Sequence, residues 1–367
     1  MRKRLFWILG ILIIFGLAVL SSAGIIDADK KFGSSYYYFF HQLLYGIVPG
    51  VLLAYILSKI NFKLWRKFSL LILLGALALM TLVFVSHFGF GAKGATRWLN
   101  IGGIVFQPAE ILKLSLVIYL AAWFSSRLAF SGLSRGRHDG AGHWLYGLAP
   151  FIVVLGFVIL LLARQPDIGT LIITIFIAVG MYFMAGAKLK HLGAILVVGV
   201  IILALLIKLE PYRFNKIIAF VDQDSNTRGI AYQVNQAKIA IGSGGIFGVG
   251  FGDSTQKFGF LPEPVGDSIF AIIAEELGLV GALATVGLFV ALCFTLTQIA
   301  MATTDPFGRL FVSGINLWIM AQAFINIAAI SGLAPLTGIP LPFISYGGTA
   351  MIALLAGLGI VFNIAKD

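Results

Sequence analysis

Long apolar segments recur along the chain and alternate with short polar stretches. About ten of these segments approach the ~20 residues that a helix needs to cross a bilayer. They cover residues 5–23, 38–58, 69–87, 108–126, 147–163, 169–186, 192–208, 268–301, 310–331 and 345–364. The pattern predicts an all-α polytopic membrane protein with about ten transmembrane helices.

Two features interrupt this regular pattern. Segment 268–301 is too long for one crossing of a hydrocarbon core about 30 Å thick. We therefore expect a break near Gly278, with a short interfacial helix before it and a true span after it. Residues 209–266 form a large loop between the seventh and eighth helices. The chain 1–367 is then a single transmembrane domain that contains this loop.

The composition supports the membrane class and argues against other classes. Hydrophobic residues make up 59% of the 367 residues, charged residues make up 11%, and the mean hydropathy is +0.99. The net charge of +11 does not indicate nucleic-acid binding, because the basic residues fall mainly in short loops between apolar segments. The single cysteine, Cys293, stands within an apolar segment and predicts neither a disulfide nor a cysteine metal site.

The basic residues predict the orientation, because positively charged short loops tend to stay in the cytoplasm. The loops on one side carry Arg2, Lys3, Arg4, Lys59, Lys63, Arg66, Lys67, Arg127, Arg135, Arg137, Lys188, Lys190 and Arg309. The short loops on the other side carry Lys30, Lys31, Lys93, Arg97 and Arg164. We therefore expect both termini in the cytoplasm, and loop 209–266 and Asp267 on the extracytoplasmic side.

Asp267 is the first candidate for chemistry. Pro262, Pro264 and Gly266 end any regular element before it, and an apolar helix follows it. A carboxylate at the end of a membrane helix is costly in a low-dielectric setting. Two interpretations remain open at this stage. Asp267 either caps the helix through a backbone N–H or acts as a general base.

Glu275 and Glu276 lie deeper in the same apolar segment. With about 100° between successive residues of a helix, Glu275 lies roughly a quarter-turn from Asp267, and Glu276 lies nearly opposite. The three acids therefore do not form one cluster on a straight helix. We expect Glu276 to pair with a neighbouring helix.

Other polar stretches on the outer side carry further charges. Residues 91–107 are rich in glycine, contain Arg97 and lead into Glu110 and Lys113. The last two are three residues apart and can pair on a helix, which favours a structural role over anion binding by Lys113. Asp167 precedes the next apolar segment, where we expect it to cap the helix rather than to take part in chemistry.

The long loop contributes cations and glycines. Residues 211–220 are amphipathic and carry Arg213. Residues 230–241 repeat apolar side chains at helical spacing, so we expect a helix that lies on the membrane or folds over the bundle. The glycine series 242–252 is either a flexible connection or a backbone that can approach a phosphate.

A proline-broken stretch, residues 335–348, ends near Ser345 and Tyr346. Irregular backbone near a membrane face is tolerated where it lines a cavity, although a tyrosine there is also a common interfacial anchor. Together the outer stretches bring cations and glycine-rich backbone to the face that holds Asp267. This combination suits an anionic, lipid-linked substrate. The pattern does not decide between transferring a group and moving the lipid.

A series of motifs runs through nearly the whole chain. They are Arg97-Trp98-Leu99, Gln107-Pro108-Ala109-Glu110 with Lys113, residues 165–170, Tyr232-Gln233, residues 240–245, Leu261-Pro262-Glu263, Asp267, Glu275-Glu276 and residues 342–348. In this order they resemble the SEDS family (shape, elongation, division, sporulation), which polymerises peptidoglycan glycan strands. Residues 256–257 and 343–346 resemble the cell-division branch, FtsW, more than the elongation branch, RodA. Val265-Gly266 replaces the His-Thr that usually precedes the family's key aspartate.

The resemblance implies ten transmembrane helices and a mechanism. Asp267 would be the catalytic aspartate and would deprotonate the 4-hydroxyl of the GlcNAc of lipid II. That oxygen attacks C1 of the MurNAc at the end of the growing chain, a β-1,4 bond forms, and undecaprenyl diphosphate leaves. The diphosphate or headgroup would be bound by Arg97, Lys113, Arg213, Ser345 and Tyr346, with Gln107, Glu110, Asp167, Glu275 and Glu276 in supporting roles.

The resemblance also implies partners and a location. A divalent cation, Mg²⁺ or Mn²⁺, could assist at a site that the sequence does not identify, and no organic cofactor is expected. The expected partners are lipid II, undecaprenyl-linked glycan, a class B penicillin-binding protein transpeptidase and other divisome proteins. The protein would act in septal synthesis from the bacterial cytoplasmic membrane. The alternatives are a RodA-type elongation polymerase, a lipid II flippase or transporter, and a scaffold that recruits a transpeptidase.

Overall fold

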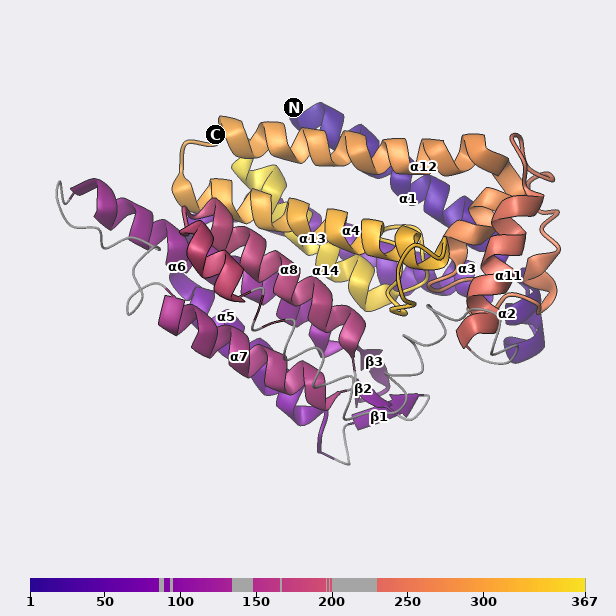
Figure 1. The fold of residues 1–367 in the computed structure, drawn as a ribbon, viewed down its shortest axis with the longest axis horizontal. Coiled ribbons are helices and arrows are strands. Elements are labelled where there is room, and N and C mark those ends of the chain that lie inside the picture. Colours follow the sequence, from indigo (N-terminus) through magenta and orange to yellow (C-terminus); the bar gives the residue numbers. More distant parts are fainter. Residues whose placement is uncertain are drawn as a thin grey trace.

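The computed structural model describes residues 1–85, 89–92, 95–133, 148–165, 167–195, 197, 199 and 230–366. Long helices dominate it and lie side by side as a bundle (Figure 1). Most of the predicted seventh helix, and part of the predicted large loop, including Arg213, lie outside the described residues. The prediction of about ten spans is therefore tested only in part.

The described helices agree closely with the predicted spans. They are α1 (Arg2–Ala23), α3 (Tyr37–Gln42) continuing through the π-helix η1 (Leu43–Ile47) into α4 (Val48–Lys59), α5 (Lys63–Leu82), α6 (Pro108–Leu133), α7 (Ala149–Arg164), α8 (Ile168–Met184), α12 (Ile269–Ala302), α13 (Pro306–Ile330) and α14 (Gly348–Ile364). Among the described residues, 6 helices are long and apolar enough to cross a membrane, and α7, α8 and α14 are shorter apolar helices. The protein is therefore a multi-pass membrane protein, as predicted.

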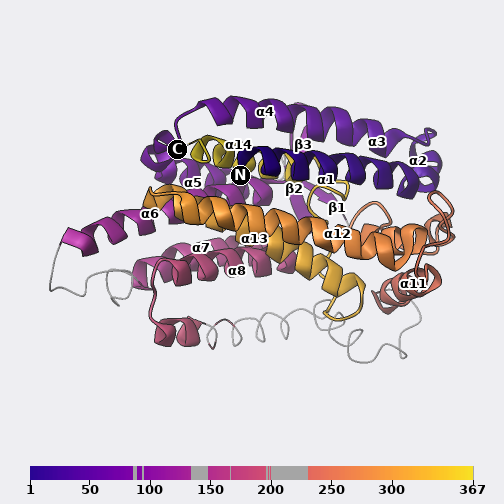
Figure 2. The ribbon, with the colours of Figure 1, turned by 90° about the horizontal axis from the view of Figure 1, so that it is seen from above.

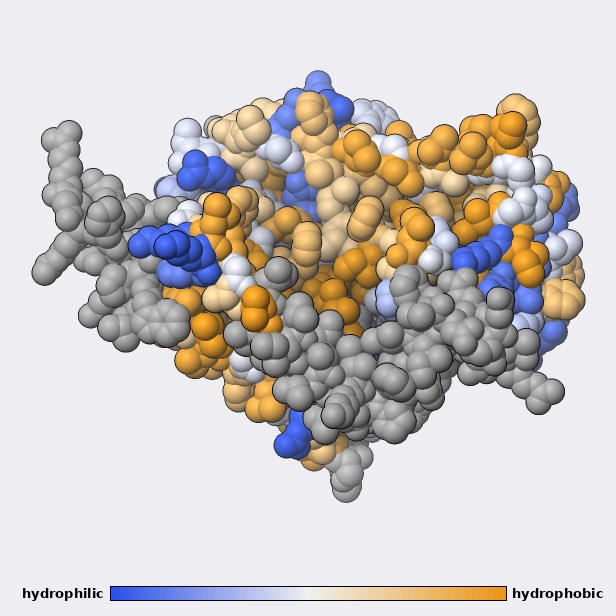
Figure 3. All heavy atoms as spheres, viewed as in Figure 1, coloured by the Kyte–Doolittle hydropathy of each residue, from blue (hydrophilic) through white to orange (hydrophobic). Residues whose placement is uncertain are grey.

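The bundle has two distinct ends. The start of α1 and the end of α14 lie toward one end, whereas α2 (Ile25–Phe32) and α11 (Ile230–Ser243) lie at the other (Figures 1 and 2). In the coloured part of the face drawn in Figure 3, apolar residues dominate the middle, and hydrophilic residues lie mainly along its margins. This distribution is typical of a protein whose middle is surrounded by lipid.

Helix α13 occupies the centre of the bundle. It packs against α12, α6, α8 and α14, while α4 packs on α14 and α5 packs on α6. The indole of Trp318 and the ring of Phe311 are fully buried on α13. Gly314 allows Val117 of α6 and Met181 of α8 to approach the helix, because a Cβ there would lie 2.7 and 2.8 Å from their side chains. Small residues at such crossings are common in membrane bundles.

A small sheet departs from the all-α prediction. Strands β1 (Gly89–Ala92), β2 (Ala95–Ile101) and β3 (Ile104–Phe106) form a 3-stranded antiparallel sheet in the order β1-β2-β3. Gly102 and Gly103 connect β2 to β3 with φ of 60° and 88°. Two glycines with positive φ form the tight turn that a two-residue hairpin requires. The glycine-rich stretch before α6 is therefore an ordered hairpin sheet, and the sequence analysis missed it.

The break in α12 lies where it was predicted. Gly278 has φ 66° and ψ −163° inside an otherwise helical run. Helix α12 packs against α1, α11 and α13, and in the segment before the break the residues Ile269 to Glu276 are all buried. This segment is thus enclosed by the protein rather than exposed as an interfacial helix.

The glycine series 242–252 docks on this break. The N–H groups of Val249 and Gly250 donate to the carbonyls of Glu275 and Glu276 at 3.0 and 3.1 Å. In return, the N–H groups of Leu279 and Val280 donate to loop carbonyls at 2.9 and 3.2 Å. The polar groups that the break frees are therefore satisfied by the loop, as a low-dielectric setting demands. The series is neither a flexible connection nor a phosphate cradle at these positions.

Gly248 should be essential for this docking. Its φ is +83°, and a Cβ would collide with the carbonyl oxygen of Glu276. We expect Gly248→Ala to lower the free energy of unfolding by about 2–4 kcal/mol, measured by thermal or denaturant unfolding of the purified protein. Gly242→Ala is the matched control, because a Cβ there meets nothing within 4 Å. Equal stability of the two variants would contradict this account of the loop.

Candidate active site

A cavity of about 350 Å³ opens at the end of the bundle where the sheet, α11 and the broken loops meet. The described outer stretches that the sequence analysis singled out contribute to it, apart from the glycine series 242–252. Its wall is formed by Arg97, Trp98, Gln107, Glu110, Asp167, Thr170, Gln233, Glu263, Gly266, Asp267, residues 336–340, Tyr346, Gly347, Thr349 and Ala350. The cavity therefore joins segments that are far apart in sequence.

Asp267 stands in the turn that precedes α12. The helix begins at Ile269 with Ser268 as its N-cap residue, and the Ser268 side chain makes no capping hydrogen bond. The N-cap position thus belongs to Ser268, one residue after Asp267. The Oδ1 of Asp267 accepts a hydrogen bond from Nε2 of Gln233 at 3.1 Å, and its backbone carbonyl accepts one from Nδ2 of Asn326 at 2.8 Å.

The stretch before α14, residues 335–347, forms hydrogen bonds with this turn. The backbone N–H of Tyr346 donates to the Val265 carbonyl at 2.9 Å, and the hydroxyl of Ser345 donates to the Gly266 carbonyl at 2.7 Å. Ser345 is buried and does not line the cavity. The structure therefore uses Ser345 to hold the turn that carries Asp267, whereas the prediction placed it on the substrate headgroup.

Tyr346 does line the cavity. Its hydroxyl lies 3.0 Å from Nδ1 of His41. Burial raises the pKa of Tyr346 to about 12, with a smaller contribution from Tyr37. The phenol therefore stays protonated at neutral pH and can serve as a hydrogen-bonding group, but not as a base.

Glu110 and Lys113 form the predicted pair. Their side chains meet at 2.8 Å and are 4% and 1% exposed. Lys113 also donates to Oε1 of Gln322 at 3.0 Å and lies 4.9 Å from the centre of the Trp318 ring. Glu110 reaches the cavity wall, and its Oε2 has no hydrogen-bond partner among the described residues. Lys113 does not line the cavity, whereas its partner Glu110 does. Lys113 would therefore influence a bound anion only indirectly, through its ion pair with Glu110.

Asp167 caps α8, as predicted. Its Oδ1 accepts from the backbone N–H of Thr170 at 3.1 Å, and its Oδ2 accepts from the Thr170 hydroxyl at 2.9 Å. Nε2 of Gln107 lies 3.3 Å from the same Oδ2. Asp167, Thr170 and Gln107 all line the cavity. The cap thus also fixes the polar wall on the α8 side.

The charges along the described wall are mainly acidic. Its carboxylates are those of Glu110, Asp167, Glu263 and Asp267, and its described cation is Arg97. The Arg97 Nε donates to the backbone carbonyl of Gln165 at 3.2 Å, which orients the guanidinium at the rim. An anionic ligand here would need further positive charge to balance these carboxylates.

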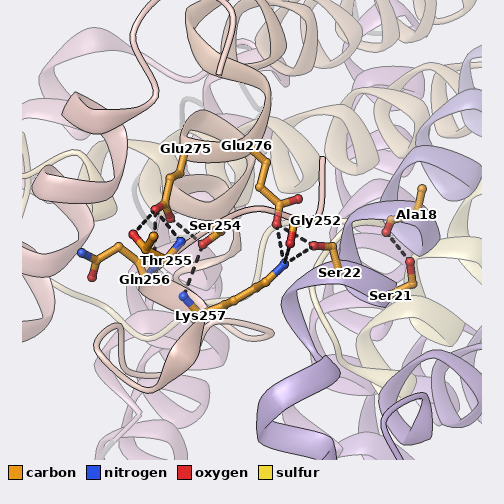
Figure 4. A network of polar contacts seen from close by, with 10 residues as sticks. All are labelled: Ala18, Ser21, Ser22, Gly252, Ser254, Thr255, Gln256, Lys257, Glu275 and Glu276. Atoms are coloured by element: carbon orange, nitrogen blue, oxygen red, sulfur yellow. Dashed lines mark hydrogen bonds and ion pairs between the residues drawn. The ribbon is translucent and has the colours of Figure 1, made fainter. Parts of the chain in front are cut away.

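Glu275 and Glu276 belong to a separate network with residues 254–257 and Ser22 (Figure 4). Glu275 accepts hydrogen bonds from Ser254 Oγ, Thr255 N and Gln256 N at 2.5, 2.9 and 3.3 Å. Neither glutamate lines the cavity. Glu275 therefore anchors the loop that follows the docked glycines.

Glu276 pairs with the neighbouring helix α1, as predicted. It accepts a hydrogen bond from the Ser22 hydroxyl at 2.5 Å and forms an ion pair with Lys257 at 3.0 Å. Lys257 is buried and also donates to the Gly252 carbonyl at 2.5 Å (Figure 4). The sequence analysis did not anticipate Lys257, because its partners come from separate segments of the chain.

The comparisons with known proteins agree with this architecture. The family model FTSW_RODA_SPOVE, described as cell cycle protein, matches residues 3–367. The chain belongs to the FtsW/RodA/SpoVE family. It is 33% identical over 351 residues to a probable peptidoglycan glycosyltransferase FtsW of Geobacter sulfurreducens, covering 96% of this chain and 91% of the relative.

Two solved structures resemble the fold. A chain from a study of a peptidoglycan synthase complex that coordinates polymerization and crosslinking matches with a TM-score of 0.78 at 27% identity, covering 99% of this chain and 97% of that chain. The crystal structure of the rod shape determining protein RodA of Thermus thermophilus matches with a TM-score of 0.70 at 27% identity, covering 99% and 96%. The family resemblance inferred from the motifs is thus confirmed.

The sequence analysis did not assign two polar residues of α13, Gln322 and Asn326, to the candidate active site. Gln322 joins Lys113 to the Pro340 carbonyl, at 3.0 Å on both sides, and Asn326 joins Asp267 to the Ile339 carbonyl. They are four residues apart, and so lie on one face of a mainly apolar helix. Two polar residues at this spacing in a membrane span are a signal that could have found them.

The buried pair predicts a stability test. We expect Lys113→Met to lower the free energy of unfolding by about 3–5 kcal/mol, because it leaves the Glu110 carboxylate buried without its counterion. The measurement is thermal unfolding of the purified protein. The double variant Glu110→Gln with Lys113→Met should recover part of this loss. The pair has no such role if Lys113→Met unfolds at the wild-type temperature.

Proposed function

We propose that this protein is a peptidoglycan glycosyltransferase that polymerises glycan strands from lipid II. The single observation that carries the proposal is the carboxylate of Asp267, which stands in the wall of a polar cavity at one end of a membrane bundle. Its position in the chain matches the family's catalytic aspartate. The name of the Geobacter relative supports the reaction class.

The reaction needs one base and one positioned acceptor. In the proposed step, Asp267 takes the proton from the 4-hydroxyl of the GlcNAc of lipid II. The resulting oxygen attacks C1 of the MurNAc at the reducing end of the growing strand. A β-1,4 bond forms with inversion while the bond from C1 to undecaprenyl diphosphate breaks, and the diphosphate carries away the bonding electrons.

The leaving diphosphate must be stabilised in a mainly acidic cavity. Arg97 lines the wall, and Arg213 is proposed to add a second guanidinium from the long loop. A divalent cation, Mg²⁺ or Mn²⁺, fits the remaining need, because Mg²⁺ is commonly held by one or two carboxylates together with substrate phosphates. In the described part of the chain, no group of three or more acids, histidines or cysteines could hold a metal by itself. Such an ion would therefore depend on the substrate.

We further propose a location and partners. The cavity would face the extracytoplasmic side of the bacterial cytoplasmic membrane, with both termini in the cytoplasm, as the loop charges predict. The FtsW-like motifs favour a role in septal synthesis together with a class B penicillin-binding protein and other divisome proteins. The likeness to a chain of a synthase complex supports a transpeptidase partner. A RodA-type role in elongation is the second candidate, favoured by the fold match to RodA.

Transport of lipid II is a weaker candidate. It needs polar side chains along a path through the bundle. The polar groups of α13 are instead engaged, since Gln322 and Asn326 donate to the carbonyls of Pro340 and Ile339 at 3.0 and 2.7 Å. They support the cavity loop rather than line a path.

Replacing the proposed base tests the reaction directly. We expect Asp267→Asn to reduce lipid II polymerisation by at least about 100-fold, because an amide cannot accept the sugar proton. The measurement is the glycan product that the purified protein makes from lipid II with Mg²⁺ or Mn²⁺. Asp253→Asn is the matched control, since Asp253 is exposed and does not line the cavity. Polymer from Asp267→Asn at the wild-type rate would refute the enzymatic proposal.

The proposed cation has its own test. We expect chelation of divalent ions with EDTA to stop polymerisation, and added Mg²⁺ or Mn²⁺ to restore it, because the acidic wall otherwise repels the diphosphate. The initial rate is measured against the concentration of free metal. Full activity in EDTA would show that protein cations alone balance the leaving group.

A further inference from the structure

We propose that Gln233 is a positioning residue for Asp267. Its side-chain amide fixes the direction in which the carboxylate faces the cavity. The inference rests on the proposed function, in which Asp267 is the base. Gln233 itself lines the cavity, but it comes from α11, a helix of the long loop rather than of the membrane bundle.

The geometry uses both donors of one amide group. Nε2 of Gln233 lies 3.1 Å from Oδ1 of Asp267 and 2.9 Å from Oγ of Ser268. A primary amide has two N–H donors, so each acceptor can take one. Ser268 is fully buried, and its hydroxyl donates to the Pro262 carbonyl at 2.8 Å. The hydroxyl therefore orients the amide, and the other N–H is aimed at the carboxylate.

Packing fixes the helix that carries this amide. Ala231, Val234, Ala237 and Ala240 form the buried face of α11, which packs on α12 and α13. These small side chains bring the α11 backbone close to the bundle. The Cα of Gln233 therefore has a set position relative to the turn before α12.

A different residue fixes the backbone of Asp267. Nδ2 of Asn326 lies 2.8 Å from the Asp267 carbonyl oxygen and 2.7 Å from that of Ile339. The main-chain position is thus held from α13, independently of α11. Asn326 fixes where Asp267 stands, whereas Gln233 fixes how its carboxylate is turned.

The orientation of the Asp267 carboxylate should affect the rate of the chemical step more than the binding of the substrate. A general base must lie within hydrogen-bonding reach of the proton that it removes. A misplacement of ~1 Å can cost a reaction about 100-fold. A hydrogen bond to an ionised carboxylate is also stronger than one between neutral groups, so it holds the side chain well. Loss of Gln233 should therefore lower kcat while substrate binding persists.

The experiment measures kcat and KM for lipid II polymerisation by the full-length wild type, Gln233→Leu, Gln233→Asn and Asp267→Asn. Gln233→Leu removes both donors at similar volume, and we expect kcat to fall at least about tenfold with KM changed by less than about twofold. Gln233→Asn keeps the amide on a shorter side chain and should also lose kcat. Gln298→Leu, a change on α12 away from the cavity, is the matched control and should keep the wild-type kcat.

The outcomes separate the two proposals. If Asp267→Asn is inactive while Gln233→Leu and Gln233→Asn keep the wild-type kcat, the role of Gln233 is refuted and the function stands. If Asp267→Asn polymerises at the wild-type rate, the proposed function fails, and the role of Gln233 fails with it. Melting temperatures are measured in parallel. A loss of kcat in both Gln233 variants that comes only with a large fall in melting temperature would overturn the positioning role in favour of a structural one.

Discussion

The backbone pairing at Gly278 is the interaction on which the rest of the structure depends. A helix that stops inside a membrane protein exposes carbonyl and N–H groups that must find partners. Here the docked loop supplies them on both sides of the break. The pairing separates a short, fully enclosed helix from the long outer part of α12 and places Asp267 just ahead of its first turn.

The same demand for partners organises the polar side chains of the site. Lys113 and Glu110 satisfy each other, and Gln322 connects Lys113 to the cavity loop. Asn326 connects that loop to the turn of Asp267. These contacts form one continuous chain of interactions beneath the cavity. Gln322 and Asn326 therefore support the cavity, which explains why the mainly apolar central helix tolerates them.

The sequence was informative where a single strong constraint acts. Helix length against bilayer thickness located the spans and the break at Gly278, and helical spacing anticipated the pair of Glu110 and Lys113. It was less informative where partners come from distant segments. The hydrogen bond between Ser345 and Gly266 joins residues 79 positions apart, and no local pattern reveals it. The hairpin was missed because glycine-rich composition was taken as irregular, although the Gly102-Gly103 pair is itself a turn signal.

The break in α12 also has a mechanical consequence. An unbroken helix of 34 residues would act as a rigid lever that transmits any tilt of its lipid-exposed end to the cavity. Leu279, Val280 and Leu283 of its outer part are exposed, whereas the part before Gly278 is enclosed. A span that is longer than the hydrocarbon core around it can adapt by tilting. The discontinuity at Gly278 ends this lever before the enclosed segment that leads to Asp267, and the docked glycine loop becomes the connection between the two parts.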